Sequence, residues 1–356
     1  MKIHLFIFLL ICLSSHVFAG MQDNAGHYEH EVRIQTRSAD VVLAGTLLIP
    51  SENHNGSVVL MITGSGDHTR NQVISGKPMF RVIANGLANA GIASLRLDDR
   101  GTASSTGPNT RESTTADRVE DMVAAMEWLM DGDIVDFNSI GVLGHSEGAL
   151  IAIKMAANHK KPDFAILLAA PSVAGGEVWV SQQLEGLIAG GYDEETIDKG
   201  EKYLREAVRL SASGAGAEEM TENTERMFQL IGIDTGTEEG RANVMGFIEH
   251  MSMPWMRYFL GDDPAEDLQG LTMPVFAVYG SHDRQTTPVL NAPSLLDGLL
   301  KAGNTDFTIR LMPDQDHFFL RKPGQPVGVH AFQEMVLSRE LIDEITAWID
   351  NRQQTK

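Results

Sequence analysis

The sequence predicts an α/β fold, in which a mostly parallel central sheet is flanked by helices and carries an α-helical insertion. Three observations support this prediction. Short apolar runs alternate with segments of helical periodicity from residue 57 to about residue 170. The alternation resumes after residue 270, and the stretch between contains no strand-like run. Strands that alternate with helices indicate a parallel sheet covered on both faces.

The predicted domain opens with an antiparallel hairpin. Residues 31–36 alternate between apolar and polar side chains, residues 41–50 are more uniformly apolar, and Pro50 ends the second strand. The alternating elements then follow in chain order: a strand at 57–62, a helix at 80–90, a strand at 92–98, a helix at 117–130, a strand at 140–143, a helix at 149–157 and a strand at 164–170.

Residues 172–269 are predicted to form the helical insertion, with acidic helices at 180–189, 194–212, 217–231 and 238–250. Placed over the carboxyl edge of the sheet, it would form a lid and shape a pocket. Methionines and aromatic residues gather at 251–259, where they either line that pocket or form the core or hinge of the lid. The core domain is therefore expected at 20–171 and 270–356, its second part adding strands at 274–280 and 307–312 and helices at 292–303 and 338–349.

The first 19 residues are typical of a cleavable signal peptide. Lys2 precedes an apolar run too short to span a bilayer comfortably, and Val17 and Ala19 fit the positions before a cleavage site. The mature chain is expected to begin near Gly20 and to be exported, periplasmic or secreted, without a stable membrane anchor; an uncleaved amphipathic anchor is the alternative. Cys12, the only cysteine, lies in this signal, so the mature chain has no disulfide and no thiol nucleophile.

Composition excludes some partners. With 43% hydrophobic and 21% charged residues the chain is typical of a globular protein, and its formal net charge of -20 argues against nucleic-acid binding.

The most informative motif is Gly-His-Ser-Glu-Gly at residues 144–148, between a predicted strand and a predicted helix. That context predicts a nucleophile elbow, a sharp turn that exposes the hydroxyl of Ser146. Gly144 and Gly148 leave room for the turn, and the backbone N–H of Glu147 would face a developing oxyanion. The alternative is an ordinary turn between a strand and a helix.

A second glycine-rich turn follows the strand at 57–62. Gly64 and Gly66 flank Ser65, so backbone N–H groups can face a ligand there. The Ser65 N–H is the candidate for the second donor of an oxyanion hole. A plain connecting turn is the alternative.

Two further polar residues come just after predicted strands: Asp283 and His317. With Ser146 they predict a triad in the chain order Ser, Asp, His, in which the imidazole activates the serine and the carboxylate orients the imidazole. Rival residues stand near these motifs: His68, His145 and His282 for the base, and Asp314 and Asp316 for the acid.

These motifs resemble those of the α/β-hydrolases, closest to bacterial esterases related to the dienelactone hydrolase and prolyl oligopeptidase branches. The resemblance covers about residues 30–350 and rests on the segments 64–67, 96–101, 144–148, 280–283 and 316–317. Many relatives have His-Gly before the oxyanion residue, whereas this chain has Thr63-Gly64 there, so the loop must be anchored differently. Arg96, Asp98 and Arg100 are expected to form an ion-pair network that supports the site; direct contact with an anionic substrate is the alternative.

The resemblance implies a serine hydrolase that cleaves carboxylic esters, short-chain acyl esters in particular, through an acyl-serine intermediate and without a metal or organic cofactor. A small-molecule ester is the expected partner. Thioesters, peptides or acyl transfer remain alternatives with the same residues, as does a ligand-binding relative without turnover. Sequence leaves the oligomeric state open.

Overall fold

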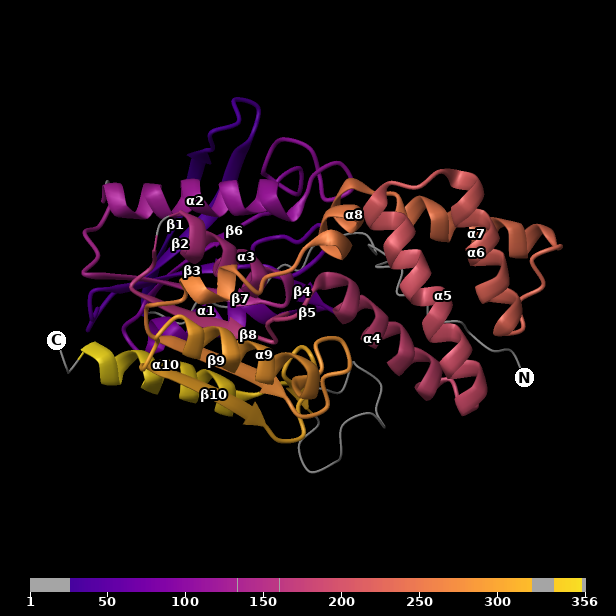
Figure 1. Cartoon of the computed structure of the whole chain (residues 1–356). Coiled ribbons are helices and arrows are strands. Elements are labelled where there is room, and N and C mark those ends of the chain that lie inside the picture. Colours follow the sequence, from indigo (N-terminus) through magenta and orange to yellow (C-terminus); the bar gives the residue numbers. More distant parts are fainter. Residues whose placement is uncertain (1–25, 133, 160, 322–335, 354–356) are drawn as a thin grey trace.

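The computed structural model describes residues 26–132, 134–159, 161–321 and 336–353 (Figure 1). The predicted signal peptide and its cleavage site lie outside these residues, so export stays a prediction. Among the helices described, none is both long and apolar enough to cross a membrane.

Eight strands form one sheet in the order β1-β2-β6-β3-β7-β8-β9-β10. Strand β2 is antiparallel to both of its neighbours, and the other neighbouring pairs are parallel, so the predicted mostly parallel sheet is confirmed. The strands are β1 (His27–Gln35), β2 (Val42–Pro50), β3 (Ser57–Ile62), β6 (Ala93–Leu97), β7 (Ser139–His145), β8 (Phe164–Leu168), β9 (Val275–Gly280) and β10 (Phe307–Met312). Two short hairpins lie outside the sheet: β4 (Val73–Ile74) with β5 (Lys77–Pro78), and β11 (Leu320–Arg321) with β12 (Val336–Leu337).

Helices cover both faces of the sheet. One face packs on α2 (Thr115–Asp131), α3 (Glu147–Asn158) and α9 (Pro288–Lys301), and the other on α1 (Met79–Asn89) and α10 (Arg339–Gln353). Strand β3 shows the cause, because Val58 and Leu60 are buried in the first of these cores and Val59 and Met61 in the second. A strand buried on both faces needs a continuous apolar run, which is the pattern of residues 57–62.

Between β8 and β9 the chain forms a helical insertion with a core of its own. Figure 1 shows its helices α5, α6 and α7 standing beyond one end of the sheet domain. Met251, Met256 and Phe259 are buried in the insertion core, so this part of the Met/aromatic cluster holds the insertion together. Its elements are α4 (Gly175–Ala189), α5 (Glu194–Ser213), α6 (Ala217–Leu230), α7 (Glu238–Met251), α8 (Pro254–Gly261) and the 3-10 helix η1 (Asp267–Gly270).

The helix α8 is absent from the sequence prediction, and α4 begins five residues earlier than the expected start at Val180. Both differences come from tertiary packing. Helix α8 has only eight residues and is rich in aromatic side chains, which are weak helix formers, so periodicity does not reveal it. Helix α4 begins with Gly175, whose N–H donates to the Asp262 carbonyl at 2.9 Å and so joins the two ends of the insertion.

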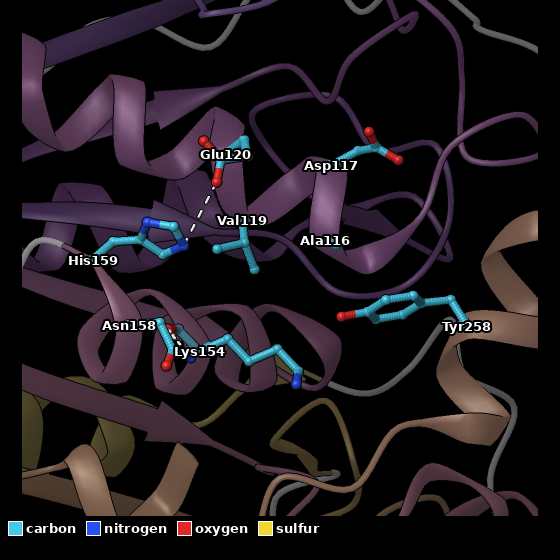
Figure 2. A pocket seen from close by; sticks show the side chains of 8 residues that line it. All are labelled: Ala116, Asp117, Val119, Glu120, Lys154, Asn158, His159 and Tyr258. Atoms are coloured by element: carbon cyan, nitrogen blue, oxygen red, sulfur yellow. Dashed lines mark hydrogen bonds and ion pairs between the residues drawn. The ribbon is translucent and has the colours of Figure 1, made fainter. Parts of the chain in front are cut away.

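The two joined ends of the insertion, near Gly175 and Asp262, form its neck. A half-buried ion cluster attaches this neck to the core domain. Lys154 Nζ on α3 donates to Asp262 at 2.7 Å and to Asp267 at 2.8 Å. Beside it lies a cavity of about 270 Å³ between α2, α3 and α8. Figure 2 shows Tyr258 of α8 facing α2 and α3 across this cavity. The neck is therefore held to α3 by charge, while Leu150 of α3 packs in the insertion core and Tyr258 lines the cavity.

We predict that Lys154→Met lowers the free energy of unfolding by about 1–2 kcal/mol, because two carboxylates lose their cation in a place that water partly screens. Urea denaturation of the whole chain measures the change. Lys199→Met, which removes an exposed pair with Glu195 on α5, is the matched control and should leave the midpoint unchanged. Equal midpoints for both variants and the wild type would contradict the assigned role of the neck cluster.

Candidate active site

The turn at residues 144–148 places Ser146 between β7 and α3 with strained backbone angles, φ 56° and ψ -122°. The Ser146 N–H donates to the Leu168 carbonyl of β8 at 2.8 Å. A Cβ on Gly144 would stand 2.2 Å from the Gly148 carbonyl oxygen, and one on Gly148 would stand 2.1 Å from that of Ile62. Neither position accepts a side chain, so the two glycines allow the close approach of the elbow to β3.

The carboxyl ends of four parallel strands meet at one edge of the sheet, and the loops that follow β3, β7, β9 and β10 carry the candidate residues. His317 lies between the other two. Its Nε2 is 3.0 Å from Ser146 Oγ, and its Nδ1 is 2.8 Å from Asp283 Oδ2. An Nδ1–H that donates to the carboxylate leaves Nε2 as the acceptor for the serine hydroxyl, which is the arrangement that activates a serine.

Backbone donors hold the carboxylate of Asp283 in place. Its other oxygen, Oδ1, accepts the N–H groups of Gln285 and Thr286, both at 2.8 Å, and the residue is 3% exposed. The carboxylate therefore has one oxygen bound to the turn and one bound to His317, so it cannot rotate away without losing these bonds.

The rival acids and bases have other partners. Asp316 Oδ1 accepts the N–H groups of Phe318 and Leu320, which shapes the turn after His317, and burial raises its pKa. Asp314 is exposed. His282 is exposed and bonds Ser281 Oγ at 3.2 Å, while His68 Nε2–H donates to the Ser65 carbonyl at 2.9 Å. None of these four lies in the Ser146–His317–Asp283 chain of hydrogen bonds.

One candidate oxyanion donor, Glu147, belongs to the elbow, and the other, Ser65, lies in the loop after β3. Gly64 packs against the elbow, since a Cβ there would be 3.4 Å from Ser146 Cβ, and Gly66 has a φ of 106°, which favours glycine. Within the described part of the chain, no acceptor bonds the N–H of Ser65 or of Glu147. Both donors are therefore available to a ligand oxygen at Ser146.

Arg118 of α2 is a residue of the candidate site that the sequence motifs did not reveal. It is 4% exposed, and its guanidinium donates to the carbonyl oxygens of Gly64 at 3.0 Å and Thr63 at 3.1 Å and to Glu147 Oε2 at 3.1 Å. Burial alone lowers the pKa of Arg118, but the carboxylates of Asp99 and Glu147 outweigh it and raise that pKa. The sequence did indicate burial of Arg118, because it is spaced four and eight residues from Met122 and Met126 and so lies on the apolar face of this helix.

Arg118 also explains how the loop is anchored without a histidine at position 63. Thr63 Oγ1 donates to Asp99 Oδ1 at 2.5 Å and accepts from Arg118 at 2.8 Å. Asp99 in turn accepts the N–H of His68 at 2.9 Å. The loop at residues 63–68 is thus fixed at both ends to the same buried carboxylate.

His145, before the serine, links the oxyanion loop to the triad. Gln72 Oε1 accepts the Gly64 N–H at 3.1 Å, and Gln72 Nε2 donates to His145 Nδ1 at 2.7 Å. His145 Nε2–H then donates to the backbone carbonyl of His317 at 2.9 Å. These bonds need a neutral imidazole, and burial together with the charge of His317 lowers the pKa of His145 well below 6.5.

The predicted network of Arg96, Asp98 and Arg100 needs correction. The three residues are buried, but they pair with other residues rather than with one another. Strand β6 ends at Leu97, so Asp98 and Arg100 lie in the loop that follows it, where neighbouring segments supply their partners. Asp98 pairs with Arg70 at 2.9 Å, Arg100 with Asp121 at 2.7 Å, and Arg96 with Asn71 and, at 3.9 Å, Glu29. Burial lowers the pKa of Arg96 to about 10.

Among the described residues, no group of three or more His, Cys, Asp or Glu side chains is arranged to hold a metal ion.

Comparison with known proteins shows a similarity in fold. A family model described as serine aminopeptidase, S33, matches residues 55–191. The structure is similar to that of the esterase Pf2001 of Pyrococcus furiosus, with a TM-score of 0.55, 16% identity and 91% of each chain covered. It is also similar to the alpha/beta hydrolase GrgF of Penicillium sp. sh18, with a TM-score of 0.51, 16% identity, and 82% and 91% of the two chains covered. The chain has the α/β-hydrolase fold.

The chain spans about 65% of the length of one sequence relative. It is 24% identical over 311 residues to the esterase EstD of Thermotoga maritima, an alignment that covers 86% of this chain and 65% of EstD. The assignment to the dienelactone hydrolase and prolyl oligopeptidase branches stays a prediction.

We predict that His145→Gln weakens the pH dependence of stability. The folded chain excludes the proton that the unfolded chain takes up at His145, so this residue costs stability as the pH falls below about 6.5. The slope of the free energy of unfolding between about pH 7.5 and 5.5 should decrease by up to ~1.4 kcal/mol per pH unit. Urea denaturation at several pH values measures it, and equal slopes in the two proteins would disprove the assignment.

Proposed function

We propose that this protein is a serine esterase that cleaves carboxylic esters, with Ser146 as nucleophile, His317 as base and Asp283 as its orienting acid. The observation that carries the proposal is the position of His317, hydrogen-bonded to both Ser146 Oγ and Asp283 Oδ2. A serine hydroxyl is a weak nucleophile until a base in contact accepts its proton. Ser146 is half-buried, so an ester can reach it.

In the proposed mechanism His317 Nε2 takes the proton of Ser146 Oγ as this oxygen attacks the ester carbonyl carbon. The N–H groups of Ser65 and Glu147 stabilise the negative charge on the carbonyl oxygen of the tetrahedral intermediate. His317 then protonates the leaving alcohol, which departs and leaves an acyl-serine. Water attacks the acyl group with His317 again as base, and the carboxylic acid is released. We assign no metal or organic cofactor to this reaction.

The helical insertion is the proposed lid, and a short acyl chain is the proposed preference. The neck of the insertion lies beside α3, where Lys154 bonds Asp262. Helix α8 contacts the elbow directly, through the bond from Trp255 to Glu147. EstD and Pf2001 are both named as esterases, which supports cleavage of esters over other acyl-transfer reactions. The family model is described as serine aminopeptidase, so cleavage of aminoacyl amides is the second candidate. Export to the periplasm or medium is proposed on the leader sequence alone.

We predict that Ser146→Ala reduces the turnover of p-nitrophenyl esters of increasing acyl length by at least about a thousandfold, because no other group supplies the nucleophile. The matched control is Ser65→Ala, which keeps the backbone N–H and should retain most of the activity. Aminoacyl p-nitroanilides in the same assay test the peptidase candidate. Full activity of Ser146→Ala would exclude the mechanism.

The charge of the insertion gives a second prediction. Residues 172–269 contain 20 acidic and 7 basic residues, a net charge of -13. A negative potential around the site repels anionic esters, and salt screens it over about 10 Å at 0.1 M. We expect kcat/KM for an ester with a carboxylate on its acyl chain to rise with added NaCl, and that for a neutral ester of the same length to change little. Parallel salt dependences would contradict this effect.

A further inference from the structure

The side chain of Glu147 has no part in the mechanism above, which uses only its N–H. It is nevertheless 1% exposed and accepts three hydrogen bonds. Thr115 Oγ1 and Trp255 Nε1 donate to Oε1 at 2.7 and 2.8 Å, and Arg118 donates to Oε2 at 3.1 Å. Burial of a carboxylate costs free energy unless it is paired and hydrogen-bonded, and the three donors to Glu147 offset that cost.

Arg118 connects this carboxylate to the other oxyanion donor. The guanidinium nitrogen that bonds Glu147 Oε2 also donates to the Gly64 carbonyl oxygen at 3.0 Å. The Gly64 carbonyl and the Ser65 N–H belong to one trans peptide plane, where they point in opposite directions. A bond that holds the carbonyl on one side therefore directs the N–H to the other. One nitrogen of Arg118 thus ties the two donor residues together.

Trp255 is the support of Glu147 that comes from the insertion. It lies on α8, 108 residues beyond Glu147, and its ring stacks on Phe259 with centroids 5.8 Å apart and an interplanar angle of 11°. Phe259 is buried in the insertion core, so the indole is presented by a packed surface. Elsewhere on α8, Tyr258 lines the cavity that it shares with α2 and α3 (Figure 2). The bond from Trp255 is therefore a direct link between this helix and the elbow.

We propose that Trp255 is a positioning residue for the oxyanion hole, which acts through Glu147 and Arg118 and couples the insertion to turnover. The inference rests on the proposed ester cleavage and adds to it. Glu147 and Arg118 hold the two donor peptides in relation to one another, and the insertion completes this arrangement from outside the sheet domain. Loss of the indole N–H should weaken stabilisation of the transition state and leave binding of the ester almost unchanged.

The test compares Trp255→Phe with Trp179→Phe on a short-chain p-nitrophenyl ester. The first variant keeps an aromatic ring against Phe259 and removes the N–H that bonds Glu147. The second makes the same chemical change in the insertion core, where Trp179 packs on Phe247 at 6.2 Å. We expect kcat to fall about tenfold in Trp255→Phe with KM within about twofold, and both constants to stay at wild-type values in Trp179→Phe.

A double-mutant cycle tests whether Trp255 acts through Glu147. Glu147→Ala keeps the backbone N–H, and Arg118 remains paired with Asp99 at 3.2 Å, so the guanidinium keeps a buried counter-ion. Once the carboxylate is absent, Trp255→Phe should cause no further loss of kcat. Circular dichroism and thermal unfolding establish that each variant is folded. Losses that multiply in the double variant would overturn the inference.

The outcomes separate this inference from the proposed function. Ester turnover by the wild type with unchanged kcat in Trp255→Phe, or with a rise in KM alone, would overturn the role of Trp255 and leave the esterase standing. A wild type that cleaves no ester would refute the proposed function. In that case the labelling rate of Ser146 by a fluorophosphonate replaces kcat, because that reaction also places charge on an oxygen at the elbow. An equal rate in Trp255→Phe would then refute the inference.

Discussion

The buried guanidinium of Arg118 is the interaction on which the candidate active site depends. It pairs with Asp99 at 3.2 Å and with Glu147 at 3.1 Å, and it also holds the backbone carbonyls of Thr63 and Gly64. Removal of the guanidinium would leave two buried carboxylates without their cation, which is far more costly than the loss of one bond. The loop after β3 and the elbow after β7 are therefore held as one unit.

A second set of bonds fixes the imidazole relative to this unit. Gln72 and His145 connect the Gly64 N–H to the backbone of His317, while Asp283 holds the ring itself. The two sets of bonds meet at the Thr63–Gly64 peptide, whose carbonyl accepts from Arg118 and whose N–H donates to Gln72. Hydrolysis of an ester needs nucleophile, base and donors within hydrogen-bond distances of one another, and buried networks of this kind maintain such distances.

The insertion differs from the sheet domain in how it is held. Its own core is apolar and also takes in Leu150 of α3. Polar bonds add to this attachment: Lys154 with Asp262 and Asp267, and Trp255 with Glu147. The sequence predicted its helices from their periodicity but missed α8, since short aromatic helices depend on tertiary packing. It also left the Met/aromatic cluster undecided. Met251 and Met256 pack in the insertion core, and Trp255 of the same cluster bonds Glu147 at the elbow.

The sequence by itself determined the order of strands and helices, the elbow at Ser146 and the three polar residues after the strand ends, because periodicity and glycine spacing are local properties of the chain. Only the tertiary structure decided which side chains meet. His317 bonds Asp283, whereas Asp316 bonds the backbone of its own turn. Asp98 and Arg100 belong to different ion pairs. The tertiary structure also brought Arg118 and Trp255 to Glu147. The physical reason is that hydrogen bonds between residues distant in the chain depend on how strands and helices pack, and local patterns carry no information about that packing.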